Sequence, residues 1–224
     1  MSTDLKLLRL LQLASPNLPV GGFTYSQGLE WAVEAGWVCG AEGFRAWQRE
    51  QLEDTLGHLD WPLLARLYQA CCDDDASAFA HWSQFLLANR ETAELRLEER
   101  QRGMALARLL DGWQLCQAPA WRPSLELTQL GGMAWLAAHW GIPLRDLALG
   151  HGFAWLEGAV MAGVKLVPFG QQAAQSLLRD LCGELPGVLD TALTLPDAQL
   201  GGGLPLLAIA SARHETQYTR LFRS

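Results

Sequence analysis

Residues 143–163 constrain the fold most, because their apolar side chains would point in almost every direction around a helix. A helix that is apolar on nearly every face is normally buried within its domain. We therefore predict an all-α fold, a multi-helix bundle in which this segment is the central buried helix. The larger apolar side chains of the segment are Leu144, Leu147, Leu149, Phe153, Leu156, Val160 and Met161.

The other periodic segments also predict helices. Leucine and alanine dominate the apolar runs, and both are strong helix formers. Isoleucine occurs only twice, so residues that favour sheets are scarce. Thr24 and Gln27 have the spacing of a capping box, and Asp60 and Ser124 are placed to cap two further helices. The expected helices cover residues 4–14, 24–35, 41–57, 61–73, 76–89, 91–112, 124–140, 171–184, 186–194 and 206–213.

The length of 224 residues fits one domain, and we predict a single domain over 1–224. Residues 15–22 contain two prolines and two glycines, so they should form a shaped loop. Residues 201–203 are all glycine and predict a flexible joint before the last helix. The polar segment 214–224 should then be a flexible C-terminal tail.

Charge and composition exclude several kinds of partner. The net charge of −7 argues against a nucleic-acid surface, which needs a basic face. No uncharged apolar run reaches the ~18 residues of a membrane span, and the N-terminus lacks the features of a signal peptide. The five cysteines contain no CxxC pair, which suits a reducing compartment. We predict a cytoplasmic protein that binds neither nucleic acid nor membrane.

A nucleotide site is not supported by the sequence. Residues 158–166 resemble a P-loop only loosely, because Val164 separates the second glycine from the lysine. Leu166 stands where a serine or threonine would hold magnesium. Small residues that allow close helix packing are the favoured interpretation.

Metal and nucleophile sites are also poorly supported. His151 stands alone on an apolar helix, which favours a satisfied core histidine. Cys71 and Cys72 with His81 could form a soft metal site, but adjacent cysteines do not easily face one ion. No G-x-S-x-G elbow is present. We predict a protein that is not an enzyme and has no cofactor of its own; a small helical enzyme using His151 or Lys165 is the disfavoured alternative.

Glutamates and arginines alternate over residues 94–102. Glu98 and Arg102 have the i,i+4 spacing of a favourable ion pair. The pattern has two interpretations, a solvated helix face or a charged docking face for a partner.

Two further features point to contacts. Lys165 interrupts an apolar stretch, so it must either extend to solvent or meet a carboxylate. The tail 214–224 is rich in tyrosine, phenylalanine and arginine, and tyrosine and arginine are favoured interface anchors. The tail is therefore predicted to dock on a partner.

Four blocks of the sequence resemble the UreF family of urease accessory proteins. They occur in the order of the family and span most of the chain. The blocks are 13–31 (LASPNLPVGGFTYSQGLEW), 91–100 (ETAELRLEER), 164–172 (VKLVPFGQQ) and 212–224 (ARHETQYTRLFRS).

The resemblance implies an all-α protein that tends to form homodimers and catalyses no reaction. It implies a scaffold that bridges the accessory protein UreD, also called UreH, and the GTPase UreG. That assembly delivers Ni²⁺ to the urease apoprotein, so Ni²⁺ and GTP are handled by the partners. The alternative is a GTPase-activating or fidelity-checking regulator of UreG.

The resemblance also implies a partner-binding site for UreD/UreH and UreG. The tail is expected to become ordered on UreD/UreH, whereas Phe23 and Arg220 are expected to help recruit UreG. The expected site residues are Pro19, Phe23, Tyr25, Gln27, Glu30, Glu94, Arg96, Glu98, Lys165, Gln171, Arg213, His214, Glu215, Tyr218, Arg220, Leu221, Phe222 and Arg223.

Overall fold

The computed structural model describes residues 2–115 and 119–223. Within those two ranges the regular elements are all helical and no strand occurs, which confirms the all-α prediction. The short segments are the 3-10 helices η1 (Gly22–Thr24) and η3 (Asp197–Gln199) and the π-helix η2 (Leu52–Asp60). The α-helices are α1 (Thr3–Ala14), α2 (Leu29–Glu34), α3 (Gly40–Gln51), α4 (Trp61–Cys72), α5 (Ala76–Ala88), α6 (Ala93–Gly112), α7 (Arg122–Leu125), α8 (Gln129–Trp140), α9 (Leu144–Leu166), α10 (Gln171–Cys182), α11 (Leu185–Ala192) and α12 (Pro205–His214).

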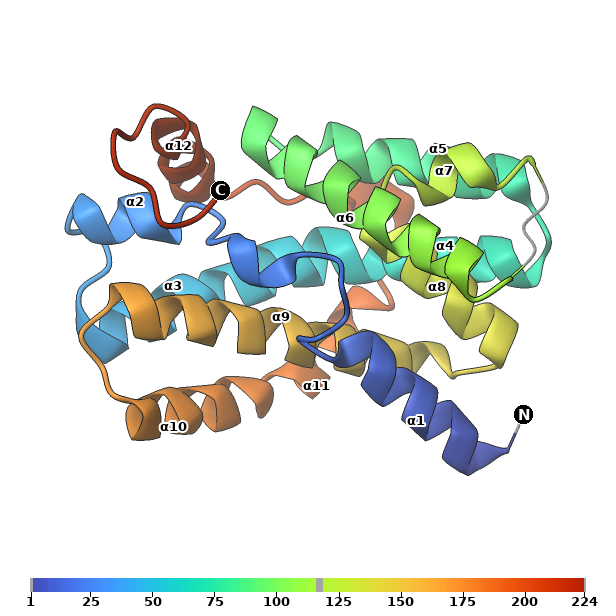
Figure 1. The fold of residues 1–224 in the computed structure, drawn as a ribbon, viewed down its shortest axis with the longest axis horizontal. Helices are drawn as coiled ribbons and strands as arrows, with labels where there is room; N and C mark the ends of the chain where they lie inside the picture. The colour runs from blue at the N-terminus through green and yellow to red at the C-terminus, as the bar shows by residue number, and fades with distance from the viewer. Residues whose placement is uncertain (1, 116–118, 224) are drawn as a thin grey trace.

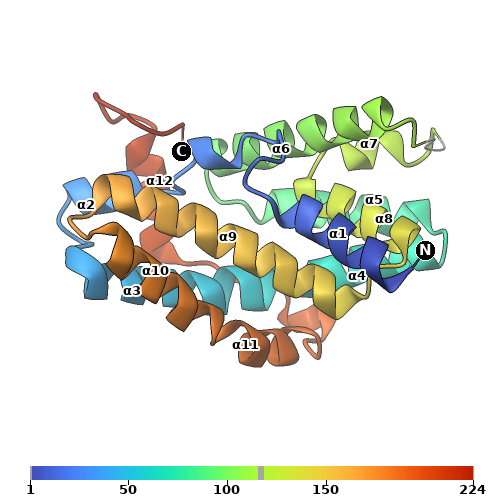
Figure 2. The same ribbon diagram turned by 60° about the horizontal axis from the view of Figure 1, so that its bottom comes forward.

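The long helix α9 has the central position that its composition predicts. It contacts α1, α3, α4, α8, α10 and α11, and its Leu147, Leu156 and Val160 are buried. Figure 1 shows α9 running along the molecule, and Figure 2 shows α10 and α11 on one side of it. Phe153 and Met161 are nevertheless 41% and 44% exposed. Its neighbours therefore leave part of the apolar surface of α9 uncovered.

By length and composition α9 could cross a membrane, but here it is a core helix. A Cβ on Gly152 would lie 2.6 Å from the ring of Trp61, and one on Gly163 would lie 2.6 Å from the ring of Phe44. These glycines let α9 approach α4 and α3 closely. The segment 158–166 thus lies within a helix, and the interpretation as a packing segment is confirmed for Gly163.

The helix predicted at 24–35 starts later than expected. Gln27 and Gly28 have φ angles of 52° and 79°, in the left-handed region that a helix does not use. The predicted capping box is wrong, because the Thr24 hydroxyl donates instead to the Gly21 carbonyl oxygen at 2.8 Å. The Gln27 amide donates to the Glu98 carboxylate at 3.1 Å. Contacts with α6 therefore decide the local conformation.

The predicted break between helices 41–57 and 61–73 is also wrong. The chain stays helical through η2, and Asp60 has helical φ and ψ angles and caps nothing. The Asp60 carboxylate instead accepts a hydrogen bond from Arg90 at 2.9 Å. Burial raises the pKa of Asp60 to about 6, although the Arg90 charge opposes this shift.

The helix predicted at 124–140 is divided into α7 and α8. Thr128 is extended, and its hydroxyl accepts a hydrogen bond from the Gly131 N–H at 2.9 Å, which starts α8. Ser124 lies inside α7 and caps no helix, contrary to the prediction. A Cβ on Gly103 would lie 2.6 Å from the Thr128 backbone nitrogen, so this turn packs directly on α6.

The glycines at 201–203 are held against η2 and do not form the expected flexible joint. The Gly201 N–H donates to the His58 carbonyl oxygen at 3.2 Å. A Cβ on Gly202 would lie 2.6 Å from the Asp54 carbonyl oxygen. Glycine is needed here because two backbones approach each other.

Candidate partner-binding site

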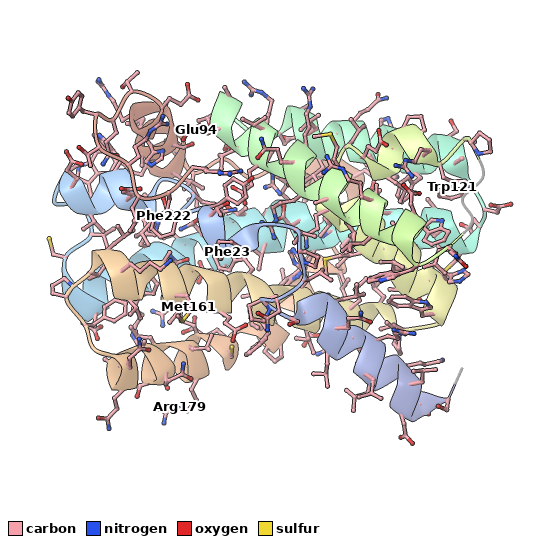
Figure 3. All side chains as sticks on the ribbon, in the orientation of Figure 1. Phe23, Glu94, Trp121, Met161, Arg179 and Phe222 are labelled. Carbon is pink, nitrogen blue, oxygen red and sulfur yellow. The ribbon has the colours of Figure 1, made fainter. Side chains whose placement is uncertain are left out.

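The C-terminal segment folds back onto the body of the protein. Helix α12 ends at His214, and residues 215–223 then return past α2 and the start of α6 (Figure 1). Figure 3 shows Phe222, Phe23 and Glu94 at this end of the molecule. The predicted flexible tail is therefore held by its own chain here; Ser224 lies outside the described residues.

Glu30 on α2 is the main acceptor for this tail. Its carboxylate is buried and accepts hydrogen bonds from the backbone N–H groups of Leu221 and Phe222, at 2.6 and 2.9 Å. The Nε2 atom of the fully buried His214 lies 3.2 Å from the same carboxylate. One side chain on α2 therefore holds both the tail and the end of α12.

Glu94 in the first turn of α6 completes this cluster. One carboxylate oxygen lies 2.8 Å from Nδ1 of His214, and the other accepts a hydrogen bond from Arg220 at 2.9 Å. A neutral imidazole has one N–H and can donate to only one carboxylate, whereas a protonated ring donates to both. We refer to Glu30, Glu94 and His214 as the tail seat.

The end of the tail is buried against the loop before α2 and against α9. Phe222 is only 6% exposed, and the Lys165 ammonium lies 5.2 Å from the centre of its ring, within cation–π range. The Arg223 N–H donates to the Thr24 carbonyl oxygen at 2.8 Å. Lys165 is exposed and meets an aromatic ring, so of its two expected arrangements the structure shows the extension to solvent.

The opposite side of the tail faces outward. Tyr218 is 103% exposed and Leu221 is 63% exposed. Arg213 and Arg223 are exposed as well. The end of α12 and the seated tail therefore expose an aromatic ring, an aliphatic side chain and two positive charges.

The glutamate side chains of α6 point inward. Glu98 is buried, and its carboxylate accepts hydrogen bonds from Gln27 at 3.1 Å and from Arg102 at 2.8 Å, which confirms the predicted i,i+4 pair. The solvated-face interpretation is therefore wrong for Glu98 and Glu94. Arg96 donates to a backbone carbonyl oxygen of its own chain at 2.6 Å.

A cavity of about 650 Å³ lies between the loop before α2 and α9, and no pattern in the sequence indicates it. Tyr25 and Gln27 line it; the Tyr25 hydroxyl donates to Gln101 at 2.7 Å, and the Trp155 indole N–H donates to Gln27 at 3.2 Å. Burial raises the pKa of Tyr25, and the nearby Glu98 carboxylate adds to this effect.

His151 differs from the satisfied core histidine that was expected. Its Nδ1 atom is buried and has no hydrogen-bond partner in the structure. Burial lowers the pKa of His151 to about 3, and the charges of Arg102 and Arg90 act in the same direction, so the ring is neutral at pH 7. Across the described ranges, no group of three or more metal-ligating side chains occurs.

The other predicted site residues are distributed around this region. Phe23 is 70% exposed on η1, next to the residue that pairs with Arg223. The Glu215 carboxylate accepts the Ala93 N–H at 3.0 Å, at the start of α6. Pro19 lies exposed in the loop, and Gln171 is exposed at the start of α10, apart from the tail seat.

Known proteins match the whole of this chain. It is 84% identical to the urease accessory protein UreF of Pseudomonas putida (strain GB-1), over all 224 residues and the full length of both chains. The corresponding protein of Klebsiella pneumoniae (strain 342) is 57% identical over the same length. That of Citrobacter koseri is 60% identical over 217 residues, or 97% of each chain. The UreF family model matches residues 38–182. The chain belongs to the UreF family.

UreF proteins are non-catalytic urease accessory proteins, and this family member takes part in urease maturation. The family-model match leaves out the loop before α2 and the tail, whereas the full-length relatives include both. Sequence reasoning selected Glu30 as a site residue in this UreF chain but missed that it binds the tail itself. No local signal could show this, because Glu30 and Leu221 are 191 positions apart.

Proposed function

We propose that this chain is a single-domain scaffold that bridges UreD/UreH and UreG, so that Ni²⁺ is transferred to the urease apoprotein. The observation that carries the proposal is the outward face of the tail. Tyr218 and Leu221 are largely exposed although the tail around them is held by hydrogen bonds. An exposed aromatic residue on an ordered segment is typical of a protein-binding surface.

The tail is proposed to bind UreD/UreH, and the neighbouring surface around Phe23 is proposed to bind UreG. Phe23 lies beside Thr24, which accepts the Arg223 N–H, so the two surfaces are continuous. In this account the chain is a cytoplasmic homodimer with no cofactor of its own. Ni²⁺ is cargo and GTP is the substrate of UreG.

Deleting residues 215–224 tests this proposal, because the deletion spares His214 and the helices. We expect the variant to keep its helical circular dichroism but to lose co-purification with UreD/UreH. Glu50→Gln, an exposed change on α3, is the matched control and should retain binding. Full binding of UreD/UreH by the deletion variant would overturn the assignment of the tail.

The alternative, a GTPase-activating regulator of UreG, requires an arginine that can reach the nucleotide phosphates. Arg220 does not meet this requirement while its guanidinium is bound to Glu94 at 2.9 Å. Measuring GTP turnover by UreG separates the two functions. Faster turnover on adding this chain, lost when a single arginine is replaced, would support the regulator.

A further inference from the structure

We propose that Glu30 is a positioning residue that preorganises the tail for its partner. This proposal deepens the proposed function and rests on it. Glu30 accepts the backbone N–H groups of Leu221 and Phe222 and faces the buried ring of His214. It thereby fixes the backbone of the tail without using any side chain that a partner could bind.

The seated tail has an inward side that holds it on the protein and an outward side that is exposed. The inward side consists of His214, Phe222 and the backbone around them, all buried or bound to Glu30. The outward side carries Tyr218, which is fully exposed, and Leu221, which is 63% exposed although its backbone N–H is bound to Glu30. Residues that hold the tail are thus separate from residues that can touch another protein.

The charges define the partner surface that fits this tail. The exposed Arg213 and Arg223 are positive, whereas the Glu215 carboxylate is directed to the backbone N–H of Ala93. A complementary surface has an apolar recess for the ring of Tyr218 and acidic groups around it.

Preorganisation increases affinity because a free tail must lose conformational freedom when it binds. Hydrogen bonds to a buried carboxylate are stronger than neutral ones. Glu30→Gln keeps the shape of the side chain but places an amide NH₂ group opposite one of the two backbone N–H groups, of Leu221 or Phe222, that each need an acceptor oxygen. At least one of these contacts must be lost, so the tail spends more time released.

Two measurements on each variant of the full chain test the proposal. Hydrogen exchange of the 215–223 amides reports whether the tail is seated, and titration with purified UreD/UreH reports affinity. For Glu30→Gln we expect amide exchange to rise by about tenfold or more and affinity to fall by about tenfold. The exposed Glu50→Gln should change neither.

Two further variants separate the inward from the outward side. Phe222→Ala removes an inward anchor near the chain end, so the fold should persist while exchange rises and affinity falls. Tyr218→Ala removes an outward side chain, so affinity should fall while tail exchange stays unchanged.

The proposal is overturned if Glu30→Gln leaves tail exchange unchanged, since Glu30 would then not hold the tail. It is also overturned if exchange rises but affinity stays within about twofold or increases, since seating would then not help binding. These outcomes differ from failure of the proposed function, in which deletion of 215–224 leaves UreD/UreH binding intact.

Discussion

Replacing Gly28 with alanine should displace α12 and release the tail. A Cβ at this position would lie 2.9 Å from the Ser211 backbone nitrogen and 3.2 Å from the Ala210 Cβ. Gly28 also has a φ of +79°, which an alanine adopts at a cost of about 1–2 kcal/mol. Overpacking against α12 adds about 1–3 kcal/mol. The contact is with backbone, so no flexible side chain can move aside.

Gly36→Ala is the matched control for this change. Gly36 has a φ of +73° but no atom within 4 Å of an added Cβ, so it incurs the backbone cost without the clash. The difference between the two variants therefore isolates the contact with α12. In thermal unfolding followed by circular dichroism, each kcal/mol corresponds to about 2–4 °C for a chain of this size.

We expect Gly28→Ala to melt well below Gly36→Ala and to show faster hydrogen exchange in the 215–223 amides. Its affinity for UreD/UreH should also be lower than that of the control. Equal melting temperatures for the two variants would refute the close packing of the loop on α12. Equal tail exchange would refute the link between α12 and the tail.

Two predictions concern the body of the protein. Gly103→Ala should lower the melting temperature, because its Cβ would meet the backbone of the turn before α8, whereas Gly112→Ala on the same helix has no neighbour within 4 Å and should not lower it. The pKa of Asp60 is raised by burial to about 6 from 3.8, so its contribution of about 3 kcal/mol to stability is present below pH 3.8 and lost as pH rises through 6. Urea unfolding of the wild type and Asp60→Asn across this range should show that the wild type loses about this much more stability with rising pH than the variant does, since the other carboxyl groups titrate in both.

Long periodic helices could be predicted closely from the sequence. The segment at 4–14 agrees with α1, because a serine caps its start and a proline follows soon after its end. The segment at 76–89 agrees with α5 for a similar reason, since Asp75 accepts the Ala78 N–H. In both cases local chemistry alone determines the boundary.

Boundaries set by distant contacts could not be predicted. Gln27 adopts a positive φ because its amide lies between Glu98 and Trp155, which are far away in the sequence. Asp60 faces Arg90 and so does not cap α4. Propensity describes neighbours along the chain, and here tertiary partners override it.

The candidate site was likewise predicted only where local sequence determines it. Composition indicated that the tail would dock, because Tyr218 and the arginines are unusual at a free chain end. Composition could not show that Phe222 points inward while Leu221 points outward, although the two are adjacent. That distinction depends on the Glu30 carboxylate, whose position is set by the packing of α2 against α12.

The bridging function is tested most directly by a pull-down on tagged UreD/UreH with UreG, in the presence and absence of this chain. We predict that UreG is retained only when the chain is present, and that the 215–224 deletion variant does not restore retention. Retention of UreG on UreD/UreH without the chain would contradict a scaffold that bridges the two proteins.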